Sequence, residues 1–478
     1  MPFINREREM AALEDFWASG AAQCIPITGR RRVGKTYLIE HFALGKRVVY
    51  YRCQLKGTEE QLPLFGAALA DAANDEVLQA QPPGNWTAVF ALVERLAHEE
   101  RLLLVLDEIP YWASRDESLP SVLQNWWDAR GRHLNLMLVL CGSAVQMMER
   151  LLTGEAPLAG CISGRLNVRP FDFRAAQRLL GMADPVEALT AYGVLGGVPL
   201  YLAFFRADRT IRENVLHAIA SPTARLYVEP AAVFAANHTS YDSSQALGVL
   251  RAIARGQHRW SDIIRATGLS AAHLGRIIEL LSGDLGLVER VLPVTERRES
   301  RTYHTQYHLT DNFFRFWFQF VEPSQGHIEF GDAERVVDGI LVQLPDYMGL
   351  PFEAICRDWV RLASAAGALP ERVGSVGTWW NPDHEVDVVG LDAQRHVAIT
   401  GECKWRNQGF GWTDLQTYLS HVQALAGVAQ VRPDSLHLLF SKHGFDDRIR
   451  DWASGTRARL LTPADLFTPF VAHSSNTR

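Results

Sequence analysis

The octapeptide GRRRVGKT, residues 29–36, constrains the fold more than any other segment of this sequence. It follows the apolar stretch QCIPIT, which is typical of a buried strand, and it precedes the helical pattern TYLIEHFAL. Glycines at both ends let the loop turn its backbone N–H groups inward, and the helix adds the positive end of its dipole. The sequence therefore predicts a phosphate-binding loop between a strand and a helix.

The residue types in this loop indicate a nucleoside triphosphate site. Lys35 is expected to bridge the β- and γ-phosphates, and the Thr36 hydroxyl to ligate Mg²⁺. The residues expected to line the nucleotide are Gly29, Arg30, Arg31, Arg32, Val33, Gly34, Lys35 and Thr36. The three consecutive arginines could equally form a solvated basic rim.

A second half of the site is expected at the end of the apolar strand RLLLVLDE, residues 101–108. Asp107 is placed to hold Mg²⁺ directly or through water, and Glu108 to polarise the attacking water, which indicates hydrolysis. Ser143 ends the next apolar strand and is either a sensor of the γ-phosphate or an ordinary strand-end serine. The cation for the transition state could come from the loop arginines, from Arg165 or Arg169, or from a neighbouring chain in a homo-oligomer.

Strands alternate with helical patterns over the first 150 residues, which predicts a parallel, doubly wound sheet. Helical periodicity follows in residues 171–220. The aromatic segment TDNFFRFWFQFVEP is expected to be a helix that ends at Pro323. The length of 478 residues fits about three domains of a multidomain α/β protein.

Residues 241–310 resemble a winged helix-turn-helix module. Its third helix would offer Ser270, His273 and Arg276 to base edges. The wing would offer further cations, which suit phosphate contacts better than sequence reading. These wing residues are Arg290, Arg297, Arg298 and Arg301. The alternative is a module used for packing or as a relay.

A group of acidic residues near the C-terminus indicates a metal site. EVDVVGL and HVAITGECKW read as two strands joined by a turn at about residues 392–395. Because side chains alternate along a strand, Asp387 would then share a face with Glu402 and Lys404, and Glu385 would lie beside Asp387. Carboxylate ligands from Asp387 and Glu402 suit Mg²⁺ or Mn²⁺, and Glu353 is available from the preceding helix. Lys404 would orient or deprotonate the water that attacks the substrate. The alternative is a surface cluster of salt bridges.

Composition narrows the class of protein further. Only five of the 48 basic residues are lysine, so lysine is expected where a guanidinium cannot substitute. These five are Lys35, Lys46, Lys56, Lys404 and Lys442. The net charge of −6 argues against a protein that coats nucleic acid through a uniformly basic surface. Six scattered cysteines, the polar N-terminus and the lack of a long apolar run favour a cytoplasmic protein without a membrane span.

The order of these motifs resembles that of archaeal and bacterial P-loop ATPases of the STAND/AAA-like class fused to a C-terminal PD-(D/E)XK nuclease-like domain. The matching segments are NREREM, GRRRVGKT, VLDE, VLGGVPLYL, LTDNFFRFWFQFVEP, PFE and GECKW. One departure is Cys161 after PLAG, where similar proteins carry an arginine, so Arg165 would have to substitute.

The resemblance implies ATP hydrolysis through the loop, Asp107 and Glu108, and an α/β restriction-endonuclease-like domain bearing Glu353, Asp387, Glu402 and Lys404. The expected division is an ATPase core (1–170), a helical lid (171–240), a winged helix (241–310), a helical connector (311–345) and the nuclease-like domain (346–470). We therefore expect an ATP-driven switch controlling a metal-dependent nuclease that acts on nucleic acid, with DNA favoured over RNA. The alternative is a DNA-binding regulator or scaffold with a silent nuclease fold.

Overall fold

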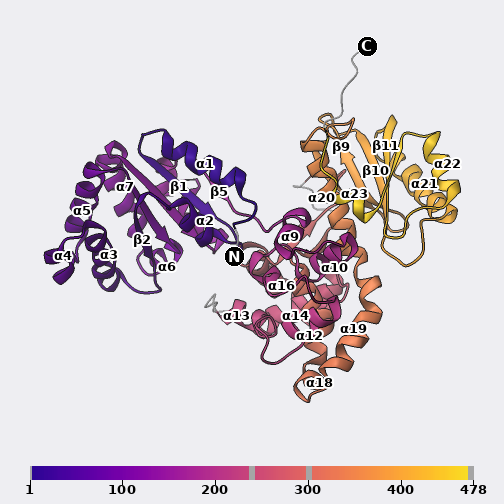
Figure 1. Ribbon diagram of the computed structural model, residues 1–478, viewed down its shortest axis with the longest axis horizontal. Helices are drawn as coiled ribbons and strands as arrows, with labels where there is room; N and C mark the ends of the chain where they lie inside the picture. Colours follow the sequence, from indigo (N-terminus) through magenta and orange to yellow (C-terminus); the bar gives the residue numbers. More distant parts are fainter. Residues whose placement is uncertain (1–2, 155, 236–242, 298–303, 472–478) are drawn as a thin grey trace, which may run out of the picture. The chain divides into compact units, whose positions relative to one another are not determined.

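The computed structural model describes residues 3–154, 156–235, 243–297 and 304–471 (Figure 1). The chain divides into two compact units. The N-terminal unit comprises Met1–Pro170 with Glu279–Gly286, and the C-terminal unit comprises Phe171–Ile278 with Leu287–Arg478. Each unit contains its own five-stranded sheet and therefore its own hydrophobic core.

The sheet of the N-terminal unit is parallel, in the order β2-β3-β4-β1-β5. Its strands are β1 (Gln23–Thr28), β2 (Arg47–Arg52), β3 (Leu102–Asp107), β4 (Leu136–Gly142) and β5 (Leu166–Asn167). The parallel sheet expected from the sequence is confirmed, although the short strand β5 was not predicted. Since all carboxyl ends meet at one edge, the segments that follow β1, β3 and β4 gather there.

Helices cover both faces of this sheet (Figure 1). The helices of this unit are α1 (Glu7–Ala18), α2 (Lys35–Phe42), α3 (Thr58–Ala73), α4 (Glu76–Ala80), α5 (Trp86–Glu99), α6 (Ile109–Ala113), α7 (Leu119–Ala129) and α8 (Val145–Leu152). One core lies against α3, α5 and α7 and includes Leu104, whereas the other lies against α1 and α2 and includes Val105. Neighbouring residues of β3 therefore enter opposite cores, as the alternation along a strand requires.

The first part of the C-terminal unit is helical and ends in an antiparallel hairpin. Its helices are α9 (Phe173–Leu180), α10 (Pro185–Leu195), α11 (Pro199–Leu202), α12 (Ile211–Ala218), α13 (Glu229–Ala235), α14 (Ser243–Ala254), α15 (Trp260–Thr267) and α16 (Ala271–Glu279). The hairpin pairs β6 (Val288–Val291) with β7 (Gln306–Leu309). Arg298 and Arg301, predicted to be wing residues, lie outside the described residues.

The aromatic segment does not stop at Pro323. The helix α17 (Asn312–Phe316) passes into a π-helical turn, Trp317–Val321, and then into a 3₁₀ turn, Glu322–Ser324. The predicted end of the helix is therefore wrong, because Pro323 lies in the first turn of the 3₁₀ segment, where no backbone N–H is required. The chain continues through α18 (Gln325–Glu329), α19 (Ala333–Tyr347) and α20 (Gly349–Ala365).

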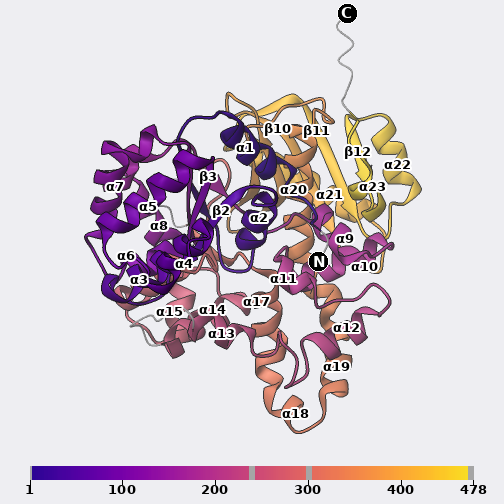
Figure 2. The same ribbon diagram turned by 60° about the vertical axis from the view of Figure 1, so that its left-hand side comes forward.

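The second sheet is mixed, in the order β12-β11-β10-β9-β8, and Figure 2 labels its strands β10, β11 and β12. The strands are β8 (Ser375–Trp380), β9 (Glu385–Leu391), β10 (Val397–Lys404), β11 (Val431–Ser441) and β12 (Ala458–Leu461). β8, β9 and β10 pair antiparallel, whereas β10, β11 and β12 pair parallel. The helices α21 (Trp412–Ala426) and α22 (Asp447–Ser454) share a core with this sheet, α20 packs on it through Trp359 against Phe440, and α23 (Pro463–Phe467) follows β12.

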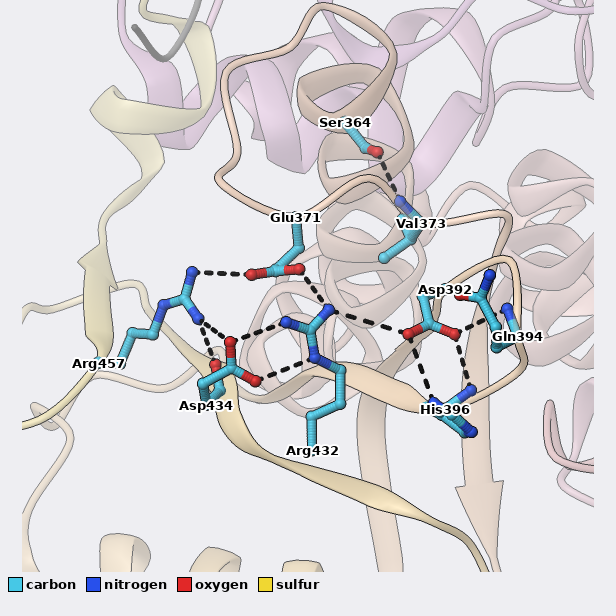
Figure 3. Close-up of polar contacts among 9 residues, drawn as sticks. All are labelled: Ser364, Glu371, Val373, Asp392, Gln394, His396, Arg432, Asp434 and Arg457. Carbon is cyan, nitrogen blue, oxygen red and sulfur yellow. Dashed lines mark hydrogen bonds and ion pairs between the residues drawn. The ribbon is translucent and has the colours of Figure 1, made fainter. Parts of the chain in front are cut away.

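A network of ion pairs holds one end of this sheet (Figure 3). The Glu371 carboxylate, 9% exposed, accepts from Arg432 at 2.7 Å and from Arg457 at 2.7 Å. Both guanidinium groups also bind Asp434, and Arg432 lies 3.8 Å from Asp392. The network therefore joins the loop after α20 to the β9–β10 turn, the start of β11 and the residue before β12.

The Glu371→Gln substitution is expected to lower the free energy of unfolding by about 2 kcal/mol, because two guanidinium groups lose the carboxylate that bridges them. This value lies below the range for fully buried pairs, since the two arginine side chains are 30% and 38% exposed. Thermal and urea denaturation would measure the loss. The control is Glu334→Gln, at an exposed pair with Arg212, which should change stability by less than about 0.5 kcal/mol. Equal losses in both variants would contradict the prediction.

Among the described residues, no helix is both long and apolar enough to cross a membrane.

Candidate functional site

The segment between β1 and α2 has the backbone of a tight phosphate-sized loop. Gly29 and Gly34 have φ angles of 146° and 92°, and Arg32 has a φ of 69°. A Cβ atom added at Gly29 would lie only 2.3 Å from the Val168 carbonyl oxygen. Glycine at position 29 is therefore required by the space available as well as by the backbone conformation.

Lys35 is held at the centre of this loop and is 5% exposed. Its Nζ donates to the Gly29 carbonyl at 2.6 Å, to the Arg30 carbonyl at 3.1 Å and to the Ser143 hydroxyl at 3.0 Å. Burial lowers the pKa of the ammonium, and the nearby Glu108 and Asp107 carboxylates act in the opposite direction. The ammonium therefore lies among neutral oxygen acceptors, where an anionic phosphate would be a stronger partner.

Asp107, at the end of β3, lies next to Thr36, as the sequence predicted for two residues of one Mg²⁺ site. The Thr36 hydroxyl is 3.4 Å from Asp107 Oδ2, which also accepts a hydrogen bond of 2.6 Å from the Tyr50 hydroxyl. Burial and the Asp107 carboxylate raise the pKa of Tyr50, so this phenol remains a donor. Tyr50 was not predicted, because its contact depends on β2 lying beside β3.

Glu108 and Ser143 are also brought together. The Ser143 backbone N–H donates to Glu108 Oε2 at 3.0 Å, and the Ser143 hydroxyl donates to Glu108 Oε1. Since Lys35 donates to the same hydroxyl, Ser143 links the ammonium to the carboxylate. Ser143 therefore contacts both Lys35 and Glu108 at the edge of the sheet.

The arginine residues near the loop have identifiable partners. Arg31 donates to the Tyr111 hydroxyl at 2.6 Å, and Arg165 donates to the Leu152 carbonyl. Arg6, which sequence reasoning missed, is 6% exposed and donates to the carbonyls of Val33 at 2.9 Å and Arg169 at 2.7 Å. Arg6 therefore links the phosphate loop to the chain that follows β5. In the sequence, only its place in the segment NREREM could have indicated this role.

A group of three carboxylates lies in the C-terminal unit. Ligand atoms of Glu353 from α20 and of Glu385 and Asp387 from β9 lie within 4.8 Å of one another. The sequence predicted that Glu385 and Asp387 share a face that meets Glu402 and Lys404, and it offered Glu353 as a further residue from the preceding helix. Glu385 was not included among the expected catalytic or metal-binding residues.

Glu402 and Lys404 lie beside this group. Asp387 Oδ2 accepts from the Cys403 backbone N–H at 2.8 Å, which fixes Asp387 against β10. The Lys404 ammonium donates to Glu402 Oε1 at 2.6 Å, while Glu402 Oε2 is buried and has no hydrogen-bond partner among the described atoms. One oxygen of Glu402 therefore remains available to a ligand.

The crowding of these carboxylates shifts their protonation. Burial first, and then the neighbouring Asp387, raise the pKa of Glu353 well above its usual range and that of Glu402 to about 8. Burial also raises the pKa of Asp387 and of Glu385. Burial alone would lower the pKa of Lys404, but Glu402 reverses this and raises it, so this ammonium stays protonated.

Arg357 supplies one neighbouring positive charge. Its guanidinium lies 3.5 Å from Glu353 and donates to the backbone carbonyl of Asp387 at 2.9 Å. The site therefore contains four acidic side chains and two basic ones, Arg357 and Lys404. Several hard oxygen ligands and an unpartnered carboxylate oxygen fit a divalent cation such as Mg²⁺ or Mn²⁺.

Parts of the chain match two described families. Residues 3–205 match an "ATPase domain predominantly from Archaea", and residues 317–417 match a family of "Archaea bacterial proteins of unknown function". The chain thus carries an archaeal-type ATPase domain followed by a domain of the second family. The match of the first domain supports ATPase activity.

Individual relatives match this chain over different shares of its length. An uncharacterized protein of Methanocaldococcus jannaschii is 25% identical over 412 residues, which cover 85% of this chain and 88% of the relative. An uncharacterized ATP-binding protein of the same organism is 46% identical over 46 residues, or 10% of this chain and 78% of that protein. Among solved structures, the Walker-type ATPase of Pyrococcus abyssi matches with a TM-score of 0.51 and 20% identity, over 66% of this chain and 96% of the other. This last similarity shows a shared ATPase fold.

Proposed function

We propose that this protein is an ATP-hydrolysing switch whose nucleotide state controls a metal-dependent nuclease-like domain acting on nucleic acid, with DNA favoured over RNA. The observation that carries the nuclease part is the group of Glu353, Glu385 and Asp387 beside the Glu402–Lys404 pair. Such a set of acidic ligands next to an ammonium suits the hydrolysis of a phosphodiester.

In the N-terminal unit, the loop residues from Gly29 to Thr36 would bind the ATP phosphates. Lys35 would contact the β- and γ-phosphates, and Thr36 and Asp107 would hold Mg²⁺, which would neutralise the charge of the phosphate chain. Glu108 would orient the attacking water, and Ser143, which already touches both Lys35 and Glu108, would connect that water to the γ-phosphate site. Arg30, Arg31 and Arg32 would border the phosphates.

In the C-terminal unit, Asp387, Glu402, Glu353 and Glu385 are the residues that would hold Mg²⁺ or Mn²⁺. The metal would supply a more acidic bound water and a positive charge next to the scissile phosphate. Glu402 accepts the Lys404 ammonium at 2.6 Å and so fixes its position. Lys404 would orient the water and offset the negative charge that develops on the phosphate.

The remaining parts of the proposal concern the modules between the two sites. The helices α14, α15 and α16 followed by the β6–β7 hairpin support a winged helix over residues 241–310. The mixed sheet that carries the acidic residues supports a restriction-endonuclease-like domain over residues 346–470. We place a helical lid at 171–240 and a connector at 311–345. Six buried cysteines without disulfides favour the cytoplasm, and a homo-oligomer would allow a neighbouring chain to supply the arginine for hydrolysis.

A cleavage assay on DNA and RNA substrates with Mg²⁺ or Mn²⁺, in the absence of nucleotide and with ATP or ADP, tests this proposal. Wild type should cut at least one substrate with a rate that depends on the nucleotide, whereas Lys404→Ala and Asp387→Ala should be inactive. If wild type and both variants are equally inert in every nucleotide state, the nuclease proposal fails. The protein would then be better described as a nucleotide-dependent DNA-binding regulator or scaffold with a silent nuclease fold.

A further inference from the structure

The hydroxyl of Ser441, the last residue of β11, is buried without a hydrogen-bond partner. The residue is fully buried, and its Oγ makes no hydrogen bond among the described atoms. A buried hydroxyl of this kind costs free energy compared with an apolar side chain of similar size, because it loses its bonds to water and gains none in return. A serine at this position therefore requires a reason other than the packing of β11.

The register of the sheet places Ser441 beside Lys404. The two residues are partners in the parallel pairing of β11 with β10, and each is the last residue of its strand. Partners in a parallel pair direct their side chains to the same face of the sheet. Thr400 and His437, partners in the same pairing, show this directly, since Thr400 Oγ1 lies 3.2 Å from His437 Nδ1. The Ser441 hydroxyl therefore lies on the face from which Lys404 projects.

The packing of β11 identifies the same face. Leu439 is the partner of Glu402 and belongs to the core that the sheet shares with α21. Phe440 points the other way and packs against Trp359 of α20. Because side chains alternate along a strand, Ser441 lies on the same side as Leu439. Ser441 thus shares its face with Glu402, one of the four acidic residues of the candidate metal site.

The Lys404 ammonium can make more hydrogen bonds than it does. It donates to Glu402 Oε1 at 2.6 Å, and its side chain is 29% exposed, so it is not enclosed by protein. An ammonium carries three N–H groups, and two remain after the bond to Glu402. Neighbouring strands lie about 4.8 Å apart, a distance that the flexible lysine side chain spans. The Ser441 Oγ is therefore an acceptor within reach of Lys404.

We propose that Ser441 is a positioning residue whose hydroxyl accepts a hydrogen bond from the Lys404 ammonium when a phosphodiester substrate is bound. This inference rests on the proposed nuclease function and identifies what orients the lysine of that site. Glu402 alone holds the ammonium at one point and leaves it free to rotate about that bond. With one N–H on Glu402 and a second on Ser441, the third is directed at the scissile phosphate and its attacking water.

The kinetic test compares Ser441→Ala with wild type in the cleavage of a DNA duplex with Mn²⁺. Ser441→Ala should lower kcat about tenfold and leave KM within about twofold, because it removes the orientation of the ammonium and no contact with the substrate. Ser441→Thr keeps a hydroxyl and should retain most of kcat. The control is Ser364→Ala, which removes a buried hydroxyl at the opposite end of α20 from Glu353 and should leave kcat unchanged.

A second measurement needs no cleavage. In buffer with EDTA, Ser441→Ala should raise the melting temperature of the full chain by about 1–3 °C, because a methyl group replaces a hydroxyl that has no partner. Ser364→Ala should lower it by a similar amount, since the Ser364 hydroxyl accepts the Val373 backbone N–H at 3.0 Å (Figure 3). Isothermal titration with MnCl₂ should give the same affinity for Ser441→Ala and wild type, because the hydroxyl is not a metal ligand.

The two measurements separate this inference from the function on which it rests. A fall in the melting temperature of Ser441→Ala, comparable with that of Ser364→Ala, would show that the hydroxyl has a structural role and would overturn the inference. If wild type cleaves DNA and Ser441→Ala has the same kcat, the positioning role is wrong and the nuclease proposal stands. If wild type cuts no nucleic acid, the proposed function fails and the positioning role fails with it.

Discussion

Replacing Lys35 with alanine is expected to abolish ATP hydrolysis, with a loss of at least about a hundredfold in turnover. The ammonium lies inside the loop, 5% exposed, and its current partners are two backbone carbonyls and the Ser143 hydroxyl. These acceptors direct it toward the space that phosphates would occupy. Without it, the charge that develops during phosphoryl transfer would lose its nearest fixed cation. Phosphate release from purified protein measures the effect.

Two further measurements separate a catalytic loss from a folding defect. Lys56→Ala, which removes an exposed pair with Glu60 of α3, should hydrolyse ATP as wild type does. The Lys35→Ala variant should melt within a few degrees of wild type, because the substitution also removes a buried charge. Full ATP turnover by pure Lys35→Ala protein would overturn the assignment of the loop.

The second large effect is expected at the acidic group of the C-terminal unit. Asp387→Asn should weaken the binding of Mn²⁺ in the absence of nucleotide by at least about a hundredfold, because a charged ligand at the centre of the group becomes neutral. Asn retains an oxygen that can accept the Cys403 backbone N–H, so the local hydrogen bond can persist. Isothermal titration with MnCl₂ would measure the affinity of the full chain.

The control for this substitution is Asp383→Asn, an exposed aspartate that precedes the same strand. It should leave Mn²⁺ binding unchanged. In metal-free buffer, Asp387→Asn should be at least as stable as wild type, because it removes one negative charge from beside Glu353 and Glu385. Unaltered Mn²⁺ affinity in Asp387→Asn would show that the carboxylate is not a ligand, whereas an unfolded variant would show a structural role.

The sequence predicted those parts of the two sites in which spacing along the chain determines contact in space. The phosphate loop could be predicted because its residues are consecutive in the sequence and lie between a strand and a helix. The pairing of β9 with β10 follows from the turn at residues 392–395, so the spacing of the two strands was enough to place Asp387 beside Glu402. The acidic residue Glu385 was visible on the same face of the strand, yet nothing in the alternation of side chains assigned it a role.

Contacts that depend on the order of strands in the sheet or on long separations in sequence were not predictable. Tyr50 reaches Asp107 only because β2 lies next to β3. Arg6 reaches the Arg169 carbonyl across 163 residues, and no periodic pattern records such a contact. The helix expected to end at Pro323 illustrates a third limit, since proline excludes an interior helical position but not the first turn of a new segment.

The two glycines of the phosphate loop look equivalent in the motif, but they would tolerate mutation differently. At position 34 no atom lies within 4 Å of an added Cβ, so only the left-handed backbone opposes a side chain, and asparagine or aspartate would be the least costly replacements. At position 29 the Val168 carbonyl occupies the space, and even alanine would require the chain after β5 to move. Substitution of Gly34 can therefore be tolerated, whereas Gly29 must remain glycine for as long as the chain after β5 packs against the loop.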